Sequence, residues 1–444
     1  MAVKTGSKTG SVERLVGSYH AWATNGASHV PAWLKDLREG GIAHFGDLGF
    51  PNMKQEAWRF TSVAPIAEGS FELAKPPARI PQLEDIRPFL LFEAGYRLVF
   101  VDGFFQRSLS TPFFDDVQSL AHVVTHRQDL VRQHLGQYAA TQDRPFSALN
   151  TAFVSDGAFV HVPSKATIAE PIQLLFLSAG GKPAVTHPRN LVVLEREARA
   201  SIVETYASLS QEEGEEGGPY WTNSVTEVVV GEAARIDYYR VQRESPRAYH
   251  VAATQTHQGR DSTVNLHTVA FGAALARHDI GAVMAGPGGR LILNGLYLLG
   301  TEQHADHHTT IDHAADHCES HEYFNGVLDG HSRGVFTGRI IVRPGAQKTD
   351  SKQTNNNLLL SADAHADSQP QLEIYADDVK CTHGSTVGPL DPRALFYLRS
   401  RGLGEHEARR LLTYGFAAEI LGRMEVATLR AQLDSIVRGR LAEP

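Results

Sequence analysis

The sequence predicts a mainly β protein: a β-helix core flanked by an N-terminal and a C-terminal α-helical domain. Short runs of β-branched and aromatic residues follow one another from 158 to about 388, and turn glycines in this stretch recur about 14 residues apart. No amphipathic helical pattern interrupts the stretch, whereas such patterns precede and follow it. We therefore expect domains at 1–95, 96–388 and 389–444, with some helix at 115–150 inside the second.

The N-terminal domain is expected to be helical because apolar residues recur there at helical spacing. One stripe consists of Val12, Leu15, Val16, Tyr19 and Trp22. A second helical pattern begins near residue 30, and we expect it to break at the Gly40-Gly41 pair. Proline-rich segments between 76 and 88 then lead to the first strand, at 98–101.

The strand-rich middle is either an antiparallel meander or a parallel β-helix, because parallel βαβ units would need intervening helices. A meander favours tight Asn-Gly or Asp-Gly hairpins, and the stretch offers few beyond Asp329-Gly330. The pattern therefore favours the β-helix. The acidic run at 212–217 is interpreted as a solvated insertion between two coils.

The C-terminal domain is predicted to contain three helices. Asp391 is a suitable N-cap, Pro392 suits the first helical position, and Gly402 follows the end of that helix. In the second helix, from about 405 to 421, Leu412, Phe416 and Ile420 recur four residues apart. We expect this apolar stripe to dock onto the β-rich body, onto a neighbouring helix or onto a partner.

Composition excludes several classes of function. The 444 residues carry a net charge of −8 and only two cysteines, which argues against a nucleic-acid-binding surface and a disulfide framework. No signal peptide and no apolar stretch of membrane-spanning length is present, so a cytoplasmic protein without membrane association is expected. No P-loop motif occurs, which predicts that the chain itself binds no ATP.

The chain has 22 histidines, and seven of them lie between 304 and 331 together with Cys318. On a helix, His313, His317 and His321 would share one face four residues apart, a spacing typical of a metal site. His313, His317 and Cys318 are the candidate ligands of a secondary metal-binding group. On strands they would instead be distributed over turns and both faces of the sheet. Structural histidines are the plain interpretation; a stand-alone His-rich metal-binding β-helix protein is the alternative function.

The other cysteine lies near a second candidate ligand. Leu372 and Ile374 alternate with polar residues and are expected to face the core. If that register continues, Cys381 and His383 both lie on the outward face, two residues apart. A thiol beside an imidazole can ligate iron or accept sulfur.

The segments at 354–361, 370–384, 386–388 and 397–402 resemble the SufB/SufD family, the scaffold subunits of the SUF iron–sulfur cluster assembly machine. The opening at 49–51 and 56–61 is similar to the SufD branch, and two cysteines are fewer than SufB-type chains usually carry. The resemblance implies a right-handed parallel β-helix between two helical domains.

The resemblance also implies a non-catalytic role: the chain would form a heterodimer with SufB through the end of the β-helix. The SufC ATPase would dock on the C-terminal helices, around Leu412, Phe416 and Ile420. His383, with Cys381 beside it, would support iron acquisition and assembly of a transient iron–sulfur cluster at the SufB interface. Whether the isolated chain forms a homodimer stays open at this point.

Overall fold

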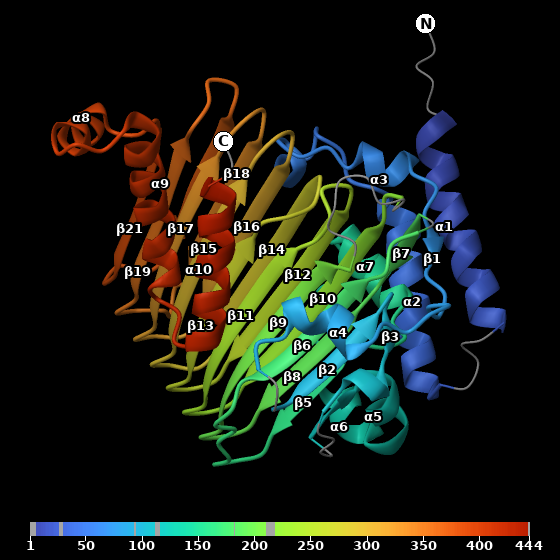
Figure 1. The fold of residues 1–444 in the computed structure, drawn as a ribbon. Coiled ribbons are helices and arrows are strands. Elements are labelled where there is room, and N and C mark those ends of the chain that lie inside the picture. The colour runs from blue at the N-terminus through green and yellow to red at the C-terminus, as the bar shows by residue number, and fades with distance from the viewer. Residues whose placement is uncertain are drawn as a thin grey trace, which may run out of the picture.

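Two parallel β-sheets dominate the computed structural model, which describes residues 6–25, 30–92, 95–111, 116–181, 183–209 and 218–442 (Figure 1). Consecutive strands alternate between the sheets, so most strands pair with the strands two places before and after them in the chain. One strand and one turn together take about 15 residues, which accounts for the glycine period. The parallel β-helix is confirmed and the meander is wrong.

The strands from β9 onward are regular and have eight to ten residues each. Sheet A contains β4 (Val117–Ser119), β5 (Ala158–Val162), β8 (Arg189–Leu194), β10 (Trp221–Val230), β12 (Tyr249–Gln258), β14 (Leu275–Met284), β16 (His304–His313), β18 (Arg333–Val342) and β20 (His365–Ile374), with β1 (Glu72–Leu73) and β7 (Ala184–Thr186) at its side. Sheet B contains β3 (Phe104–Phe105), β2 (Arg97–Val101), β6 (Ile172–Ser178), β9 (Arg199–Ser208), β11 (Arg235–Arg243), β13 (Thr263–Ala270), β15 (Arg290–Leu299), β17 (Glu319–Leu328), β19 (Asp350–Leu359) and β21 (Lys380–Gly388).

The inward side chains of the two sheets form one elongated core. Parallel in-register pairing stacks equivalent residues of successive coils in rows along the solenoid. One such row in sheet B is apolar through most of its length and runs Ile172, Ile202, Tyr238, Leu266, Leu293. Its members are buried in the main hydrophobic cluster, so each coil covers the apolar edge of its neighbour.

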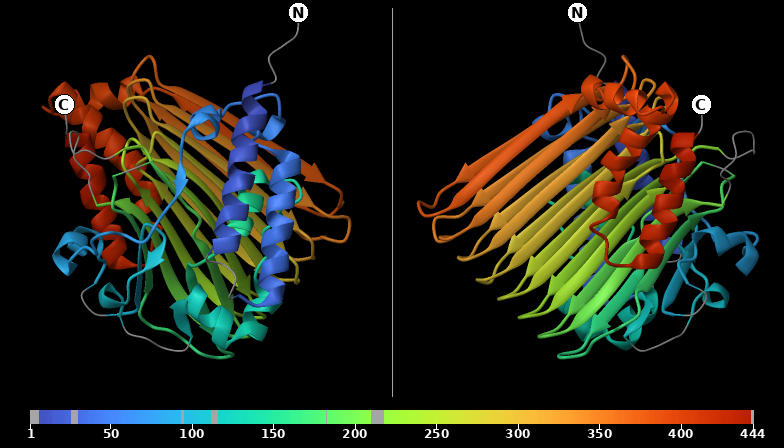
Figure 2. Two further views of the ribbon diagram at one scale, coloured as in Figure 1. Left: turned by 90° about the vertical axis from the view of Figure 1, so that its right-hand side faces the viewer. Right: turned by 60° about the vertical axis from the view of Figure 1, so that its left-hand side comes forward.

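Helices from the N-terminal part cover the outer face of sheet A. They are α1 (Gly6–Asn25), α2 (Ala32–Leu48), α3 (Ala64–Glu68) and, from later in the chain, α7 (Pro145–Ala152). Tyr19 and Phe45 pack with the sheet residue Trp221 in one apolar cluster, and Figure 2 shows α1 and α2 side by side over this face. The predicted break at Gly40-Gly41 is wrong, because α2 continues through both glycines.

The first end of the solenoid is closed by other elements. The short strands β3 and β4 pair antiparallel with β2 and β5. The helices α5 (Leu120–His126) and α6 (Gln128–His134) pack there through Leu120 and Val131. The helix α4 (Leu83–Ile86) lies beside β2 and β6, where Ile86 packs with Val99 and Leu175. Helix within 115–150 is therefore confirmed. The acidic run at 212–217 lies outside the described residues.

The C-terminal helices begin and end close to their predicted positions: α8 (Pro392–Ser400), α9 (Glu405–Leu421) and α10 (Ala427–Ala442). Asp391 caps α8 by accepting a hydrogen bond from the Arg393 amide. α9 and α10 pack on the outer face of sheet B, where Leu433 and Val437 meet Val269 and Leu296. α8 projects beyond the sheets (Figures 1 and 2). Among the described helices, none has the length and apolar character needed to cross a bilayer.

Candidate functional site

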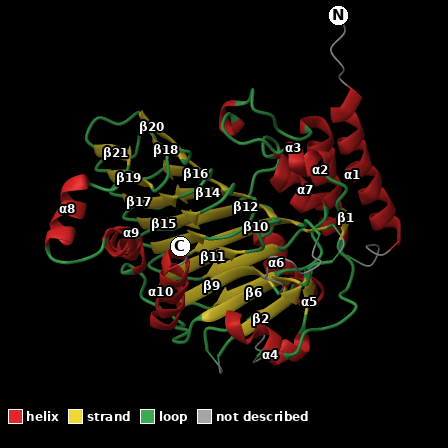
Figure 3. Cartoon of the chain, turned by 45° about the horizontal axis from the view of Figure 1, so that its top comes forward, coloured by secondary structure: helices red, strands yellow, loops and turns green. Residues whose placement is uncertain are grey.

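The second end of the solenoid is formed by β20 and β21, and it is open. Each of these strands pairs with one neighbour within its own sheet, β18 or β19. Most of β21 is exposed to solvent, as are the large apolar side chains of Ile374, Tyr375 and Val387. A long edge strand with exposed apolar residues is a template for pairing with another chain. Figure 3 shows β20 and β21 at this rim, away from the helices α1 and α2.

Cys381 and His383 do not lie on the outer face of the sheet, and the prediction of an outward pair is wrong. Cys381 is in register with Ser351, and His383 with Gln353, both of which are buried inside the solenoid. The turn between β20 and β21 resets the alternation, so Ile374 and Cys381 both belong to inward rows. Cys381 is half-buried against the main core, whereas His383 is exposed because no further coil covers it.

The rows that lead to these two residues change from apolar to polar over the last coils. The row with Leu266 and Leu293 continues as Glu322, Gln353 and His383. The neighbouring row continues from Leu291 as Ser320, Ser351 and Cys381. These two rows therefore end in groups that donate and accept hydrogen bonds, whereas their members farther from the rim, such as Leu266 and Leu291, are apolar.

These polar side chains form two hydrogen-bonded columns. Hydrogen bonds of 2.8 Å join His313 Nε2 to Ser320 Oγ and Ser320 Oγ to Ser351 Oγ, directly beneath Cys381. In the second column Gln353 Nε2 donates to Glu322 Oε2 over 2.6 Å, directly beneath His383. Hydrophobic patterning could not identify these residues; the signal in the sequence is their recurrence at about 30 residues, one full coil.

Burial dominates the electrostatics of this end. It raises the pKa of the Glu322 carboxyl to about 7, against the opposing effect of hydrogen bonds from Thr309 and Gln353. Burial, assisted by the nearby Asp350 charge, also raises the pKa of the Cys381 thiol. Cys381 is thus a protonated thiol at neutral pH, and a bound metal would have to displace its proton.

The secondary metal-binding group is not assembled. His313 is buried at the end of β16 and bonded to Ser320, whereas His317 lies in an exposed turn with a left-handed φ of 55° and contacts Asp316. The Cys318 thiol contacts the backbone carbonyl oxygen of Gly286, and burial raises its pKa. Within the described ranges no three His, Cys, Asp or Glu side chains converge as a metal site. The distribution over turns and both faces, expected for strands, is confirmed.

The predicted docking stripe on α9 is only partly available. Ile420 is fully buried against sheet B, so its assignment to a partner surface is wrong. Phe416 is half-buried at the edge of the same cluster, and Leu412 is half-buried farther along the helix. By contrast α8 has no buried residue, and Phe396 is 75% exposed.

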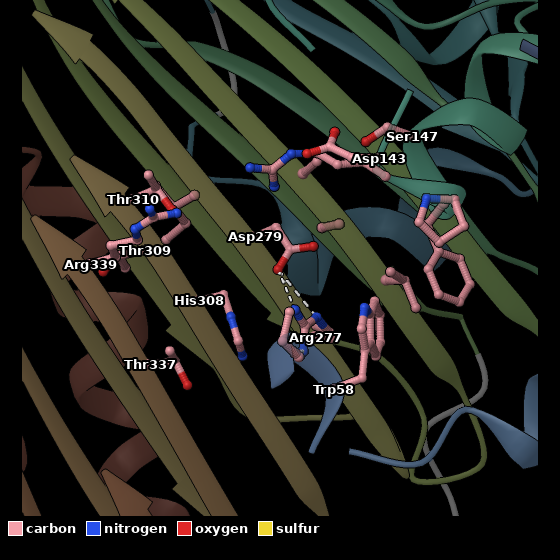
Figure 4. Close-up of a pocket in the computed structure, with 18 of the residues that line it drawn as sticks. Trp58, Asp143, Ser147, Arg277, Asp279, His308, Thr309, Thr310, Thr337 and Arg339 are labelled. Atoms are coloured by element: carbon pink, nitrogen blue, oxygen red, sulfur yellow. Dashed lines mark hydrogen bonds and ion pairs between the residues drawn. The ribbon is translucent and has the colours of Figure 1, made fainter. Parts of the chain in front are cut away.

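A polar cavity of about 440 Å³ lies on the outer face of sheet A, beside the short 3-10 helix at Glu56–Trp58 (Figure 4). It was not predicted from the sequence. The guanidinium of Arg277 lies 3.7 Å from the Trp58 ring centroid and pairs with Asp279 and the buried Asp306 at 2.8 and 2.6 Å. The positive charge of Arg277 is thus paired with carboxylates of the same chain. Figure 4 also shows His308 from the histidine-rich segment at this cavity, where burial lowers its pKa.

Comparison with known proteins places this chain in one family, through two family models that together cover most of its length. The model of the SufBD protein N-terminal region matches residues 11–174, and that of the SUF system FeS cluster assembly SufBD core domain matches 176–416. An iron–sulfur cluster assembly SufBD family protein of Synechocystis is 35% identical over 92% of this chain and 91% of its own length.

Two relatives carry the name iron–sulfur cluster assembly protein SufD. The Escherichia coli protein is 31% identical over 95% of this chain and 96% of its own length. The Bacillus subtilis protein is 27% identical over 93% and 94%, respectively. The chain described here belongs to the SufBD family of the SUF system for iron–sulfur cluster assembly.

Proposed function

We propose that this chain is a non-catalytic SufD-type scaffold that binds a SufB-type subunit through the open end of its solenoid. The observation that carries the proposal is the asymmetry of the two ends: one is closed by antiparallel strands and helices, whereas β20 and β21 form an open, partly apolar rim. A second parallel β-helix with its own open rim would continue the coils and cover Ile374, Tyr375 and Val387.

In this arrangement His383 and Cys381 would lie at the subunit interface and take part in binding iron and in building a transient cluster. The imidazole of His383 is exposed at the rim, while the thiol of Cys381 is half-buried and protonated, which makes His383 the more accessible ligand. Iron or the nascent cluster is the cargo here, and a thiolate of the partner would complete the ligand set. A mixed nitrogen–sulfur set suits release to a carrier.

We further propose that a SufC-type ATPase docks on the C-terminal domain, mainly through α8. Phe396 and Tyr397 are the large exposed apolar side chains of this helix, at 75% and 56% exposure. α9 and α10 are anchored on sheet B through Ile420 and Leu433, so force applied to α8 would pass into the solenoid. No P-loop occurs in the sequence, and in this proposal the ATPase supplies the nucleotide-driven movement.

Cluster loading tests the proposal. The chain is co-expressed with the SufB- and SufC-type subunits, and iron and sulfide are measured in the purified complex. We expect His383→Ala to remove most of the cluster without loss of the complex, whereas His331→Ala, which changes an exposed turn histidine, leaves loading unchanged. Full loading of the His383→Ala complex would refute the role of His383. The alternative, a stand-alone His-rich metal-binding protein, has no geometric support among the described residues.

A further inference from the structure

Gln353 occupies a special place in the row that ends at His383. It is buried and in register with Glu322 on one side and His383 on the other. In the coils farther from the rim the same row holds Leu266 and Leu293. An apolar side chain therefore fits this row, and a buried amide–carboxyl pair costs desolvation that a leucine would not. Packing alone does not account for Gln353.

The amide of Gln353 is held in one orientation. Its Nε2 donates to Glu322 Oε2 over 2.6 Å. On the facing sheet, a Cβ at Gly338 would collide with this amide group, so the amide fills the space that a side chain there would need. Held in this way, the amide has little freedom to rotate.

The carbonyl oxygen of the Gln353 amide, by contrast, has no hydrogen-bond partner among the described residues. Gln353 Oε1 is buried, and no described residue donates a hydrogen bond to it. An orphaned carbonyl oxygen beside the last residue of the row costs free energy until a donor reaches it. Because His383 is the residue in register on this side, its imidazole is the nearest candidate donor along the row.

We propose that Gln353 is a positioning residue for His383: its Oε1 accepts a hydrogen bond from one ring N–H of His383, so that the other ring nitrogen presents its lone pair at the open rim. Glu322 contributes by holding the Nε2 half of the amide through its hydrogen bond, which leaves Oε1 to accept from another donor. The inference rests on the proposed function of His383 as an iron ligand. Histidines that bind metals commonly donate their second N–H to a fixed acceptor, which sets the tautomer and the ring orientation.

The test is the tautomer of His383 in the isolated, iron-free chain. Long-range ¹H–¹⁵N spectra at high pH report the tautomer of each neutral imidazole, and subtraction of the His383→Asn spectrum identifies the His383 signals. We expect wild-type His383 to be almost entirely one tautomer. In Gln353→Leu, and in the Glu322→Leu/Gln353→Leu double variant that leaves no unpaired carboxyl, we expect the two-tautomer mixture of a free imidazole.

Ser351→Ala is the matched control, because Ser351 lies at the same depth in the neighbouring row, beneath Cys381. It should leave the tautomer of His383 unchanged. Since leucines occupy the same row in other coils, the leucine variants should fold, as circular dichroism and thermal melting will show. A mixture of tautomers in the wild type, or a single tautomer that persists in folded Gln353→Leu, would overturn the inference.

A second readout links the inference to function. Titration of the co-purified complex with iron(II) under anaerobic conditions should give an affinity about 10- to 100-fold lower for Gln353→Leu than for Ser351→Ala. Full cluster loading by His383→Ala would refute the proposed function, while the tautomer spectra would still decide whether Gln353 orients His383. The two failures are therefore distinguishable.

Discussion

Arg189 and Glu227 form an ion pair of 2.6 Å in which both side chains are fully buried, between sheet A and α7. Arg189 also donates to Asn150 and Thr151 of α7. Glu227 accepts hydrogen bonds from the backbone amides of Gly136, Tyr138 and Ala139. This pair therefore ties the segment 136–151 to the solenoid.

Replacing one partner of this pair should destabilise the protein strongly. Arg189→Met leaves the Glu227 carboxylate buried without its cation, and the expected loss is about 3–5 kcal/mol of the free energy of unfolding. Urea denaturation will measure it. Arg343→Met is the control, because Arg343 pairs with Asp312 at the surface, where such pairs contribute at most about 1 kcal/mol. Equal losses for the two variants would contradict the assigned role.

The close approach of α2 and α7 at Gly41 gives a second prediction. A Cβ at Gly41 would lie 2.7 Å from the Ala152 nitrogen and 2.8 Å from the Ala148 oxygen, both backbone atoms of α7. We therefore expect Gly41→Ala to lower stability by about 1–3 kcal/mol. At the neighbouring Gly40 nothing lies within 4 Å of the added Cβ, so Gly40→Ala should raise stability by up to about 1 kcal/mol. Thermal melting of the two variants compares them directly.

The solenoid could be predicted from the sequence because its signals are local, whereas the role of the Gly40-Gly41 pair depends on a distant segment. Turn spacing, strand composition and the Asp391 cap are local signals, and they predicted the β-helix and the C-terminal helices correctly. Gly41 does not end the helix; it allows α7 to pack closely against α2. This role depends on α7, which lies more than 100 residues later in the chain. The break was predicted from propensity, and tertiary packing overrode it.

The sequence identified Cys381 and His383 as candidate site residues, but the predicted direction of their side chains was wrong. Cys381 and His383 were found from their types and spacing, yet their direction depends on a turn whose effect on register is not encoded in residue alternation. Glu322 and Gln353 have no apolar signature, and their spacing of about 30 residues from each other and from His383 acquires a meaning only once the length of a coil is known. Similarly, the α9 stripe alone did not show that Ile420 docks on the chain's own sheet.

The buried Glu322 carboxyl predicts a specific dependence of stability on pH. Its folded pKa is about 7, whereas an ordinary carboxyl titrates near 4.5. Between these two pH values the folded state therefore binds more protons than the unfolded state. The contribution of Glu322 to the free energy of unfolding accordingly falls as the pH rises from 4.5 to 7, with a maximum slope of about 1.4 kcal/mol per pH unit. Buried histidines act in the opposite sense: the pKa of His307 is lowered to about 4 by burial, which reduces stability as pH falls below 6.5.

The difference between the wild type and Glu322→Gln isolates the carboxyl from these other groups. We expect Glu322→Gln to gain stability relative to the wild type as pH rises from 4.5 to 7, with a total change of about 2–3 kcal/mol. Urea unfolding at half-unit pH intervals measures the two curves. A difference that stays constant over this range would show that Glu322 titrates normally.

The exposed helix α8 gives the last prediction, which separates the two proposed partner surfaces. Phe396 is 75% exposed on α8, and Tyr375 is 61% exposed at the solenoid rim, so neither contributes much to the stability of the isolated chain. A large aromatic side chain that becomes buried at the centre of an interface commonly contributes about 2 kcal/mol or more, which is roughly 30-fold in affinity.

Phe396→Ser should therefore weaken capture of the SufC-type ATPase by at least that factor while the SufB-type subunit still co-purifies. Tyr375→Ser should do the reverse, because the rim is where a second solenoid would continue the coils. Each variant is thus the control for the other, and pull-down with separately tagged subunits, quantified by titration, distinguishes them. Loss of both partners in one variant, with an unchanged melting temperature, would show that the two surfaces are not separate and that α8 is not a dedicated docking helix.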